Sequence, residues 1–137
     1  MITVLYVDAD AQMRSIISHL CERTSTFSIH ATGSYSDALE WLRKNQADAI
    51  VSNNHLEETN GIKLLRTIRQ KGSLTPFIFF TDEDDSFLRN SAYILDAFGF
   101  IVRKGYEKKP ILNLMRMIYW AVGRNDMDAI LENIESP

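Results

Sequence analysis

The segment AIVSNNHLEETNG, residues 49–61, joins two kinds of secondary structure. Its first four residues are mostly apolar and partly β-branched, which is typical of a buried strand. Its last residue, Gly61, stands directly before a run whose apolar residues have helical spacing. Three polar, uncharged residues, Asn53, Asn54 and His55, directly follow the predicted strand. The segment therefore predicts one strand–loop–helix unit with a neutral polar group where the strand ends.

The same alternation runs along the chain on both sides of this segment. Five short apolar runs predict strands: ITVLYV (2–7), FSIHA (27–31), DAIVS (48–52), PFIFF (76–80) and FGFIV (98–102). Amphipathic stretches with helical spacing follow each run; Ser36 is predicted to cap the second helix, and the fourth is expected over residues 84–97. Because right-handed crossovers join such units, they imply an α/β fold, a parallel sheet with helices on both faces.

Composition indicates one domain with a proper core. The chain has 137 residues, of which 45% are hydrophobic, enough to bury a core without disulfides or a structural metal. Cys21 is the single cysteine, so no disulfide can form within the chain, and a reducing, cytoplasmic location is expected. The first residues lack the basic region of a signal peptide, and no apolar run approaches the length of a membrane span.

The negative charge is concentrated at the C-terminal end. The formal net charge of the chain is −3. Residues 124–137 carry all of it, with one basic residue against four acids: Arg124, Asp126, Asp128, Glu132 and Glu135. We therefore predict a domain over residues 1–123 and an acidic helical tail over residues 124–137. No basic stripe typical of nucleic-acid binding is present, so contact with nucleic acid or membrane is not expected.

Polar side chains follow four of the five predicted strands. Asp8 and Asp10 follow the first strand, Asn53 the third, Thr81 the fourth and Lys104 the fifth. In an open α/β sheet, ligands bind beyond the carboxyl ends of the strands. The two acids, the amide, the hydroxyl and the ammonium are therefore expected to meet at one edge of the sheet.

This set of residues, in this order, resembles the receiver domain of two-component response regulators. The resemblance covers about residues 1–122. It rests on VLYVDAD, the strand IVS before Asn53, Gly61 eight residues later, FFT ending at Thr81, and VRKG with Lys104. It implies a flavodoxin-like, doubly wound sheet of five parallel strands in the order 2-1-3-4-5. Glycine after the lysine, at Gly105, is similar to a variant found in many archaeal and sensor-associated receivers.

The resemblance assigns the polar residues to a phosphorylation site that uses Mg²⁺. Asp8 matches the first acid of the family's pair, which contacts the ion largely through water. Ala9 matches the second acid, which is normally a direct ligand. Asn53 matches the phosphoacceptor aspartate, and the backbone carbonyl of His55 would be a further ligand.

The remaining matches concern the response to phosphorylation. Thr81 matches the hydroxyl that bonds the phosphoryl group, Lys104 the cation that pairs with it, and Ile101 the position of an aromatic switch residue. Glu57 and Glu58 replace the usual Pro-Gly of the loop after the acceptor. Two interpretations of these glutamates stay open: solvated surface charges, or a substitute metal ligand.

The departures from the family pattern all weaken phosphorylation. Asn53 is a neutral amide and a very poor nucleophile, and Ala9 offers no oxygen to a metal. Mg²⁺ prefers charged oxygens in octahedral geometry, and this site keeps Asp8, plus Asp10 if its loop turns inward. We expect no enzymatic activity, no required cofactor, weak or absent Mg²⁺ binding, and a pocket in which Lys104 neutralises Asp8 with Asn53 bridging. Changing both Ala9 and Asn53 to aspartate is expected to restore more phosphorylation than changing Asn53 alone.

A degenerate receiver of this kind would act through protein partners. The hypothesis is a phosphorylation-independent receiver that binds a sensor histidine kinase or another receiver. Tyr106, Tyr119 and Trp120 are expected on a partner or homodimer surface formed by the fourth helix, the fifth strand and the fifth helix; alternatively, residues 124–137 cover Trp120. Two other functions stay open: phosphorylation at a nonstandard residue, and small-molecule catalysis on the same fold.

Overall fold

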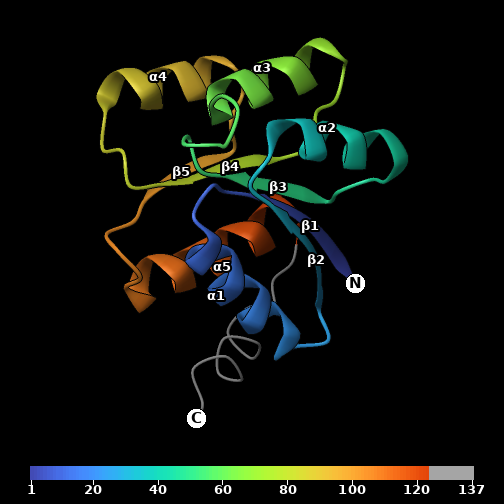
Figure 1. The fold of residues 1–137 in the computed structure, drawn as a ribbon, viewed down its shortest axis with the longest axis vertical. Coiled ribbons are helices and arrows are strands. Elements are labelled where there is room, and N and C mark those ends of the chain that lie inside the picture. The colour runs from blue at the N-terminus through green and yellow to red at the C-terminus, as the bar shows by residue number, and fades with distance from the viewer. Residues whose placement is uncertain (124–137) are drawn as a thin grey trace.

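The computed structural model describes residues 1–123, in which strands and helices alternate along the chain (Figure 1). The elements in order are β1 (Ile2–Val7), α1 (Ala11–Glu22), β2 (Phe27–Thr32), α2 (Tyr35–Lys44), β3 (Ala49–Ser52), α3 (Gly61–Gln70), β4 (Phe77–Thr81), α4 (Ser86–Ile94), β5 (Gly99–Val102) and α5 (Lys108–Ala121). All five predicted strands are present. Within this part of the chain, no helix has the length and apolar character needed to cross a bilayer.

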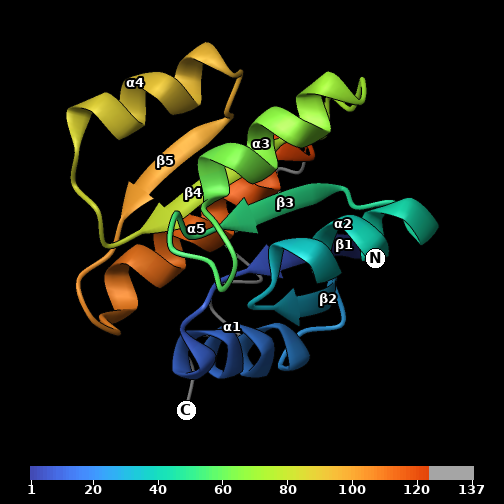
Figure 2. The ribbon, with the colours of Figure 1, turned by 45° about the horizontal axis from the view of Figure 1, so that its top comes forward.

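The five strands form one parallel sheet in the order β2-β1-β3-β4-β5. This order confirms the predicted doubly wound, flavodoxin-like fold. β1 and β3 are neighbours in the interior of the sheet, with Val7 beside Ser52, and at the far edge Thr81 of β4 pairs with Val102 of β5. Because the strands run in one direction (Figure 2), the residues that follow them open onto a single edge.

Helices cover both faces of the sheet: α1 and α5 pack on one face, and α2, α3 and α4 on the other (Figure 1). Side chains alternate between the two faces along each strand. Val4 and Tyr6 of β1 belong to the core beneath α1 and α5, whereas Leu5 and Val7 belong to the core on the opposite face. This alternation places Asp8, the residue directly after β1, in series with Val4 and Tyr6.

Ser34, not Ser36, caps α2. The backbone of Ser34 is extended, and its hydroxyl accepts the N–H of Asp37 at 3.1 Å. Ser36 lies inside the first turn of the helix, where its N–H and its hydroxyl both donate to Glu58. The prediction of Ser36 as the cap is therefore wrong, because the helix already begins at Tyr35 and Ser36 lies within its first turn.

α4 is shorter than the predicted helix over residues 84–97. Asp96 has a φ of 69°, a left-handed conformation that is common just after a helix ends. Arg69 of α3 donates to the carbonyls of Leu95 at 3.2 Å and of Asp96 at 3.0 Å. These contacts satisfy backbone groups that the end of the helix leaves free.

Candidate functional site

Four buried polar residues meet at the carboxyl edge of the sheet. Asp8, Asn53 and Arg103 directly follow β1, β3 and β5, and Thr81 is the last residue of β4. Their exposed fractions lie between 0% and 5%. An open pocket of about 440 Å³ lies beside them. The pocket is lined by Ala9, Asp10, Asn53, His55, Asp82, Glu83 and Arg103.

The cation in the pocket is Arg103, not Lys104. Arg103 Nη1 lies 2.6 Å from Asp8 Oδ2, whereas Lys104 is exposed and makes no contact with Asp8. The cause is the alternation of side chains along β5. Ile101 is buried in the core beneath α5, Arg103 continues that series, and the residue after it faces away. The predicted pairing of Lys104 with Asp8 is therefore wrong by one residue.

Asp8 is held by four donors. Its Oδ1 accepts the N–H of Asp10 at 2.9 Å and the amide Nδ2 of Asn53 at 3.1 Å. Its Oδ2 accepts the hydroxyl of Tyr6 at 2.8 Å and Nη1 of Arg103 at 2.6 Å. Burial, and then the charge of Asp8, raise the pKa of Tyr6, so its hydroxyl stays protonated and donates. Both oxygens of the buried carboxylate are therefore satisfied by the chain itself.

The guanidinium of Arg103 has partners on several sides. Besides Asp8, its Nη1 contacts the hydroxyl oxygen of Tyr6 at 3.2 Å and the carbonyl of Phe80 at 3.3 Å. Its central carbon lies 5.1 Å from the centre of the Phe80 ring, and Nη2 lies 3.9 Å from Asp10 Oδ2. Burial lowers the pKa of Arg103, but the hydrogen bond to Asp8 and the neighbouring charges outweigh it, so the pKa is raised. The side chain is a permanent cation.

Asp10, a candidate metal ligand, caps α1. Its Oδ1 accepts the backbone N–H groups of Gln12 at 3.0 Å and Met13 at 3.1 Å, and the Tyr106 hydroxyl donates to its Oδ2 at 2.9 Å. Burial raises the pKa of Asp10, but the N–H of Met13, then Tyr106 and Arg103, outweigh it, so the pKa is lowered. This carboxylate stabilises the start of a helix and joins the loops after β1 and β5.

The wall of the pocket formed after β3 and β4 is neutral where it is buried. Asn53 Oδ1 is buried and has no hydrogen-bond partner in residues 1–123. The hydroxyl oxygen of Thr81 accepts the N–H of Glu83 at 3.2 Å, and Asn54 Nδ2 donates to both carboxylate oxygens of Glu83 at 3.3 Å. A Cβ at Gly61 would lie 2.6 Å from the Asn53 carbonyl oxygen, so glycine allows α3 to approach the acceptor position this closely.

These residues do not fit a bound Mg²⁺. Donors occupy both oxygens of Asp8, and the guanidinium of Arg103 lies against Oδ2. Ala9 has no side-chain ligand, and its N–H donates at 3.3 Å to the His55 carbonyl, the group that the resemblance assigns to the ion. The described residues contain no cluster of three or more His, Cys, Asp or Glu side chains that could hold a metal.

The two loop glutamates lie against the turn between β2 and α2. Glu58 accepts the hydroxyl of Ser34 at 2.6 Å and the N–H of Ser36 at 2.9 Å, and the hydroxyls of these serines lower its pKa to about 2. The N–H of Glu57 donates to the carbonyl of Gly33 at 3.0 Å. Neither glutamate lines the pocket.

The position of the aromatic switch residue shifts together with the cation. Because Arg103 takes the place expected for Lys104, the residue three positions before the cation is Phe100 rather than Ile101. Ile101 is a core residue beneath α5. Phe100 is half-buried and stacks on Phe79, with ring centroids 5.6 Å apart. Phe100 is therefore the aromatic residue at that position.

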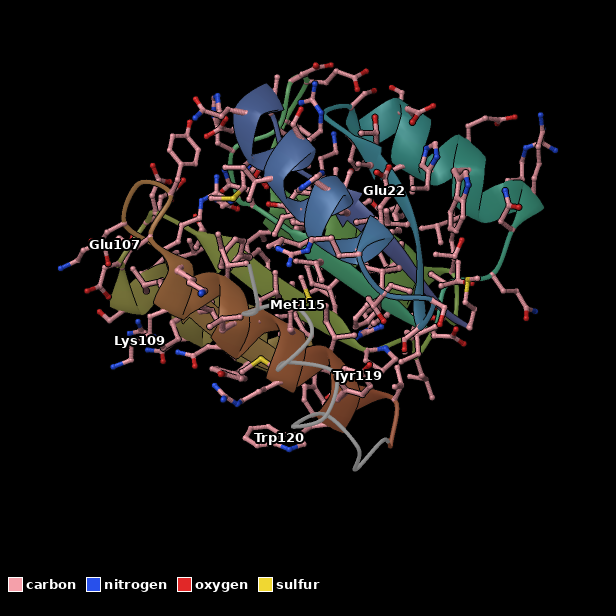
Figure 3. The ribbon with its side chains drawn as sticks, turned by 90° about the horizontal axis from the view of Figure 1, so that it is seen from below. Glu22, Glu107, Lys109, Met115, Tyr119 and Trp120 are labelled. Carbon is pink, nitrogen blue, oxygen red and sulfur yellow. The ribbon has the colours of Figure 1, made fainter. Side chains whose placement is uncertain are left out.

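One of the three residues expected on a partner surface is buried. Tyr119 is inaccessible to solvent and packs edge to face against Phe27, with ring centroids 5.4 Å apart, so its placement on a surface is wrong. Tyr106 and Trp120 are 43% and 56% exposed, and Trp120 projects outward near the end of α5 (Figure 3). The predicted acidic tail, residues 124–137, lies outside the described residues, and so does the alternative in which this tail covers Trp120.

Comparison with known families agrees with this geometry. The family model described as the response regulator receiver domain matches residues 4–116. The chain belongs to the response regulator receiver domain family. It is a receiver domain of two-component signalling.

Individual relatives share the fold at low sequence identity. The sensory transduction protein LytT of Bacillus anthracis is 27% identical over 117 residues; the match covers 85% of this chain and 47% of that protein, so this chain spans about half the length of that relative. The receiver domain of Francisella response regulator 1452 has a TM-score of 0.79 at 20% identity, covering 90% of this chain and 98% of that one. The non-phosphorylated HemR receiver domain of Leptospira biflexa has a TM-score of 0.77 at 24% identity, covering 86% and 94%.

Proposed function

We propose that this receiver domain works without phosphorylation and signals by binding a protein partner. One observation carries the proposal. Asn53 stands at the acceptor position and donates its amide to Asp8, whose charge Arg103 already neutralises. The acceptor position thus holds no nucleophile, and the buried cation of the pocket is already paired with Asp8.

The chemistry of the side chains supports this proposal. Phosphoryl transfer to a protein needs a nucleophilic atom and positive charge that stabilises the transferred group. The nitrogen of Asn53 is a delocalised amide that already donates to Asp8, and its Oδ1 is buried. Asp82 and Glu83 line the mouth of the pocket and would repel an incoming phosphoryl group. We therefore propose that the domain catalyses no phosphotransfer of its own.

The partner surface that we propose comprises α4, β5 and α5. α4 lies beside β5 at the edge of the sheet (Figure 2). Large apolar side chains are exposed on α4, on the loop after it and on α5: Phe87 at 78%, Tyr93 at 48%, Ile94 at 84%, Phe98 at 44% and Trp120 at 56%. Large exposed apolar side chains are typical of protein interfaces. The proposed partner is a sensor histidine kinase or another receiver, met in the cytoplasm; a second copy of this chain is one such receiver.

Intact-mass measurement after treatment with acetyl phosphate and Mg²⁺ tests the proposal. A receiver that retains the acceptor aspartate is treated in parallel to show that the reagent is active. We expect the mass of the wild-type chain to stay unchanged. A phosphoryl adduct on the wild-type chain would contradict the proposal, and its survival in Asn53→Ala would place the phosphate on a nonstandard residue.

The partner surface is tested separately by substitution. Ile94→Glu puts a charge on the exposed side of α4, and Leu74→Glu is a matched control, because Leu74 is 81% exposed but lies in the loop before β4. We expect Ile94→Glu to weaken association with the cognate kinase or receiver, or with a second copy, at least ten-fold. Equal weakening by both variants would contradict the assignment of this face.

A further inference from the structure

We propose that Arg103 replaces the divalent ion of this pocket, so that the chain excludes Mg²⁺ by placing its own cation beside Asp8. This inference rests on the proposed function, because it concerns the same pocket and explains why the pocket has no place for the ion. A site occupied by Arg103 also differs from a site that has only lost its metal ligands. A site that only lacks ligands regains its ion when the ligands return, whereas an occupied site does not.

The charge of the pocket matches one guanidinium. A receiver with an acceptor aspartate and a complete acidic pair gathers three carboxylates, which one monovalent cation cannot balance. In this chain Ala9 and Asn53 are neutral, and Asp8 is the one carboxylate in the described range that is fully buried. Arg103 offsets that single charge at 2.6 Å. A divalent ion added to this pair would lie close to the guanidinium, and no second buried carboxylate in the described range would balance it, which is costly.

The geometry favours arginine over lysine for this role. One nitrogen of Arg103 contacts the Asp8 carboxylate, the Tyr6 hydroxyl and the Phe80 carbonyl together, while the second nitrogen faces Asp10. The planar guanidinium also lies over the Phe80 ring. A guanidinium is more weakly hydrated than an ammonium and has a rigid array of donors, so it suits a buried ion pair. A lysine ammonium on its flexible stem could leave Asp8 and return to solvent.

Contrary to the expectation from the sequence, this placement predicts that restoring the two missing acids will not by itself restore the metal site. Aspartates at positions 9 and 53 would supply the carboxylates that the family uses. Arg103 would still lie against Asp8 Oδ2 and would repel an incoming ion, and the donors from Tyr6, Asp10 and Arg103 would still have to be displaced. Changing Arg103→Lys in the same background should open the site.

The test is Mn²⁺ binding, measured from the electron paramagnetic resonance signal of the free ion. The proteins are the wild-type chain, the double variant Ala9→Asp/Asn53→Asp, and the triple variant that adds Arg103→Lys. We expect the triple variant to bind Mn²⁺ at least ten-fold more tightly than the double variant. Arg66→Lys in the double background is the matched control, because Arg66 is an exposed arginine of α3, and it should leave the affinity unchanged.

Circular dichroism establishes that each variant is folded, and Arg103→Lys alone gives a second comparison if the triple variant is not. That single variant should bind Mn²⁺ more tightly than the wild-type chain. Equal Mn²⁺ affinity with and without Arg103→Lys would overturn the role of Arg103. Phosphoryl labelling of the wild-type chain would overturn the proposed function instead, so the two failures are distinguishable.

Discussion

The two walls of the pocket differ in how their polar groups are satisfied. On the wall after β1 and β5, Asp8 has a donor at every position and a cation at 2.6 Å, and Tyr6 and Arg103 contact each other as well. On the wall after β3 and β4, the Asn53 oxygen is buried without a partner, and the Thr81 hydroxyl accepts one backbone N–H. The first wall is charged and balanced, and the second is neutral and incompletely satisfied.

This difference indicates that the substitutions form a set. Replacing only the acceptor would leave an acidic pair that still needs a metal. Replacing only the metal ligand would leave an acceptor that lacks its ion. With Ala9, Asn53 and Arg103 together, the remaining buried charge of Asp8 is neutralised within the chain. Substitutions that weaken the charged wall should therefore destabilise the fold more than those that change the neutral wall.

The largest expected effect is that of Arg103→Met. It leaves Asp8 buried without its cation, and breaking a buried ion pair from one side typically costs about 3–5 kcal/mol. Urea unfolding at neutral pH measures the loss. Asp8→Asn combined with Arg103→Met should recover part of it, because no buried charge then remains. Arg66→Met, an exposed control, should change the free energy of unfolding by less than about 0.5 kcal/mol; a similar value for Arg103→Met would contradict the balance described for the first wall.

Tyr6→Phe should have the next largest effect. It removes the hydroxyl that donates to Asp8 and accepts from Arg103, and a hydrogen bond to a charged group contributes about 1.5–3 kcal/mol. Tyr35→Phe is the matched control, because the Tyr35 hydroxyl bonds at 2.9 Å to the hydroxyl of Thr67, a neutral partner. The free energy of unfolding of the Tyr35→Phe control should fall by about 1 kcal/mol. Equal losses in urea unfolding would mean that the charge of the first wall adds nothing to this hydrogen bond.

Asn53→Asp tests the neutral wall. The new carboxylate replaces an amide that donates to Asp8 at 3.1 Å, so two like charges face each other and the pKa of the new group rises. A rise of one unit costs about 1.4 kcal/mol at neutral pH. The cost should be full above the raised pKa and should disappear as the pH falls below the unfolded value, about 3.9. Urea unfolding at several pH values measures it, and a variant as stable as the wild-type chain at pH 7 would contradict this picture.

The smallest effect concerns an exposed carboxylate, for contrast with the buried one. The hydroxyls of Ser34, then of Ser36, lower the pKa of Glu58 from 4.5 to about 2. Because the folded-state value is the lower one, the stabilisation is present above pH 4.5 and is lost as the pH falls towards 2. Glu58→Gln should flatten the fall in stability across this interval. A pH profile of thermal unfolding that is identical in both proteins would show that these contacts do not stabilise the fold.

The layout of the fold was predictable because it depends on local patterns. Short apolar runs and helical spacing place all five strands, and the crossover rule limits how they can be joined. The start of α2 was not predictable in this way. Ser34 and Ser36 are both plausible caps, and both bond to Glu58, a residue of a different loop, so no local pattern shows which of them begins the helix.

The site was predictable where it follows from strand ends and less so where it depends on side-chain direction. Asp8, Asn53 and Thr81 are buried at the predicted edge because each stands at the end of a strand. Two adjacent cations follow β5, and the family motif drew attention to Lys104; the alternation from Ile101 would have selected Arg103. Tyr6 was missed because a tyrosine in an apolar strand has no sequence signal for a polar role.

The central claim is that this pocket takes up neither a divalent ion nor a phosphoryl group, because Arg103 already neutralises its buried carboxylate and its acceptor position is an amide. The most direct measurement is the ¹H–¹⁵N NMR spectrum of the wild-type chain before and after addition of Mg²⁺ and acetyl phosphate. We predict unchanged amide signals for Ala9, Asn53, Thr81 and Arg103, because the contacts of the pocket should persist. Saturable shifts of these signals with Mg²⁺, or a new set of signals with acetyl phosphate, would contradict the claim.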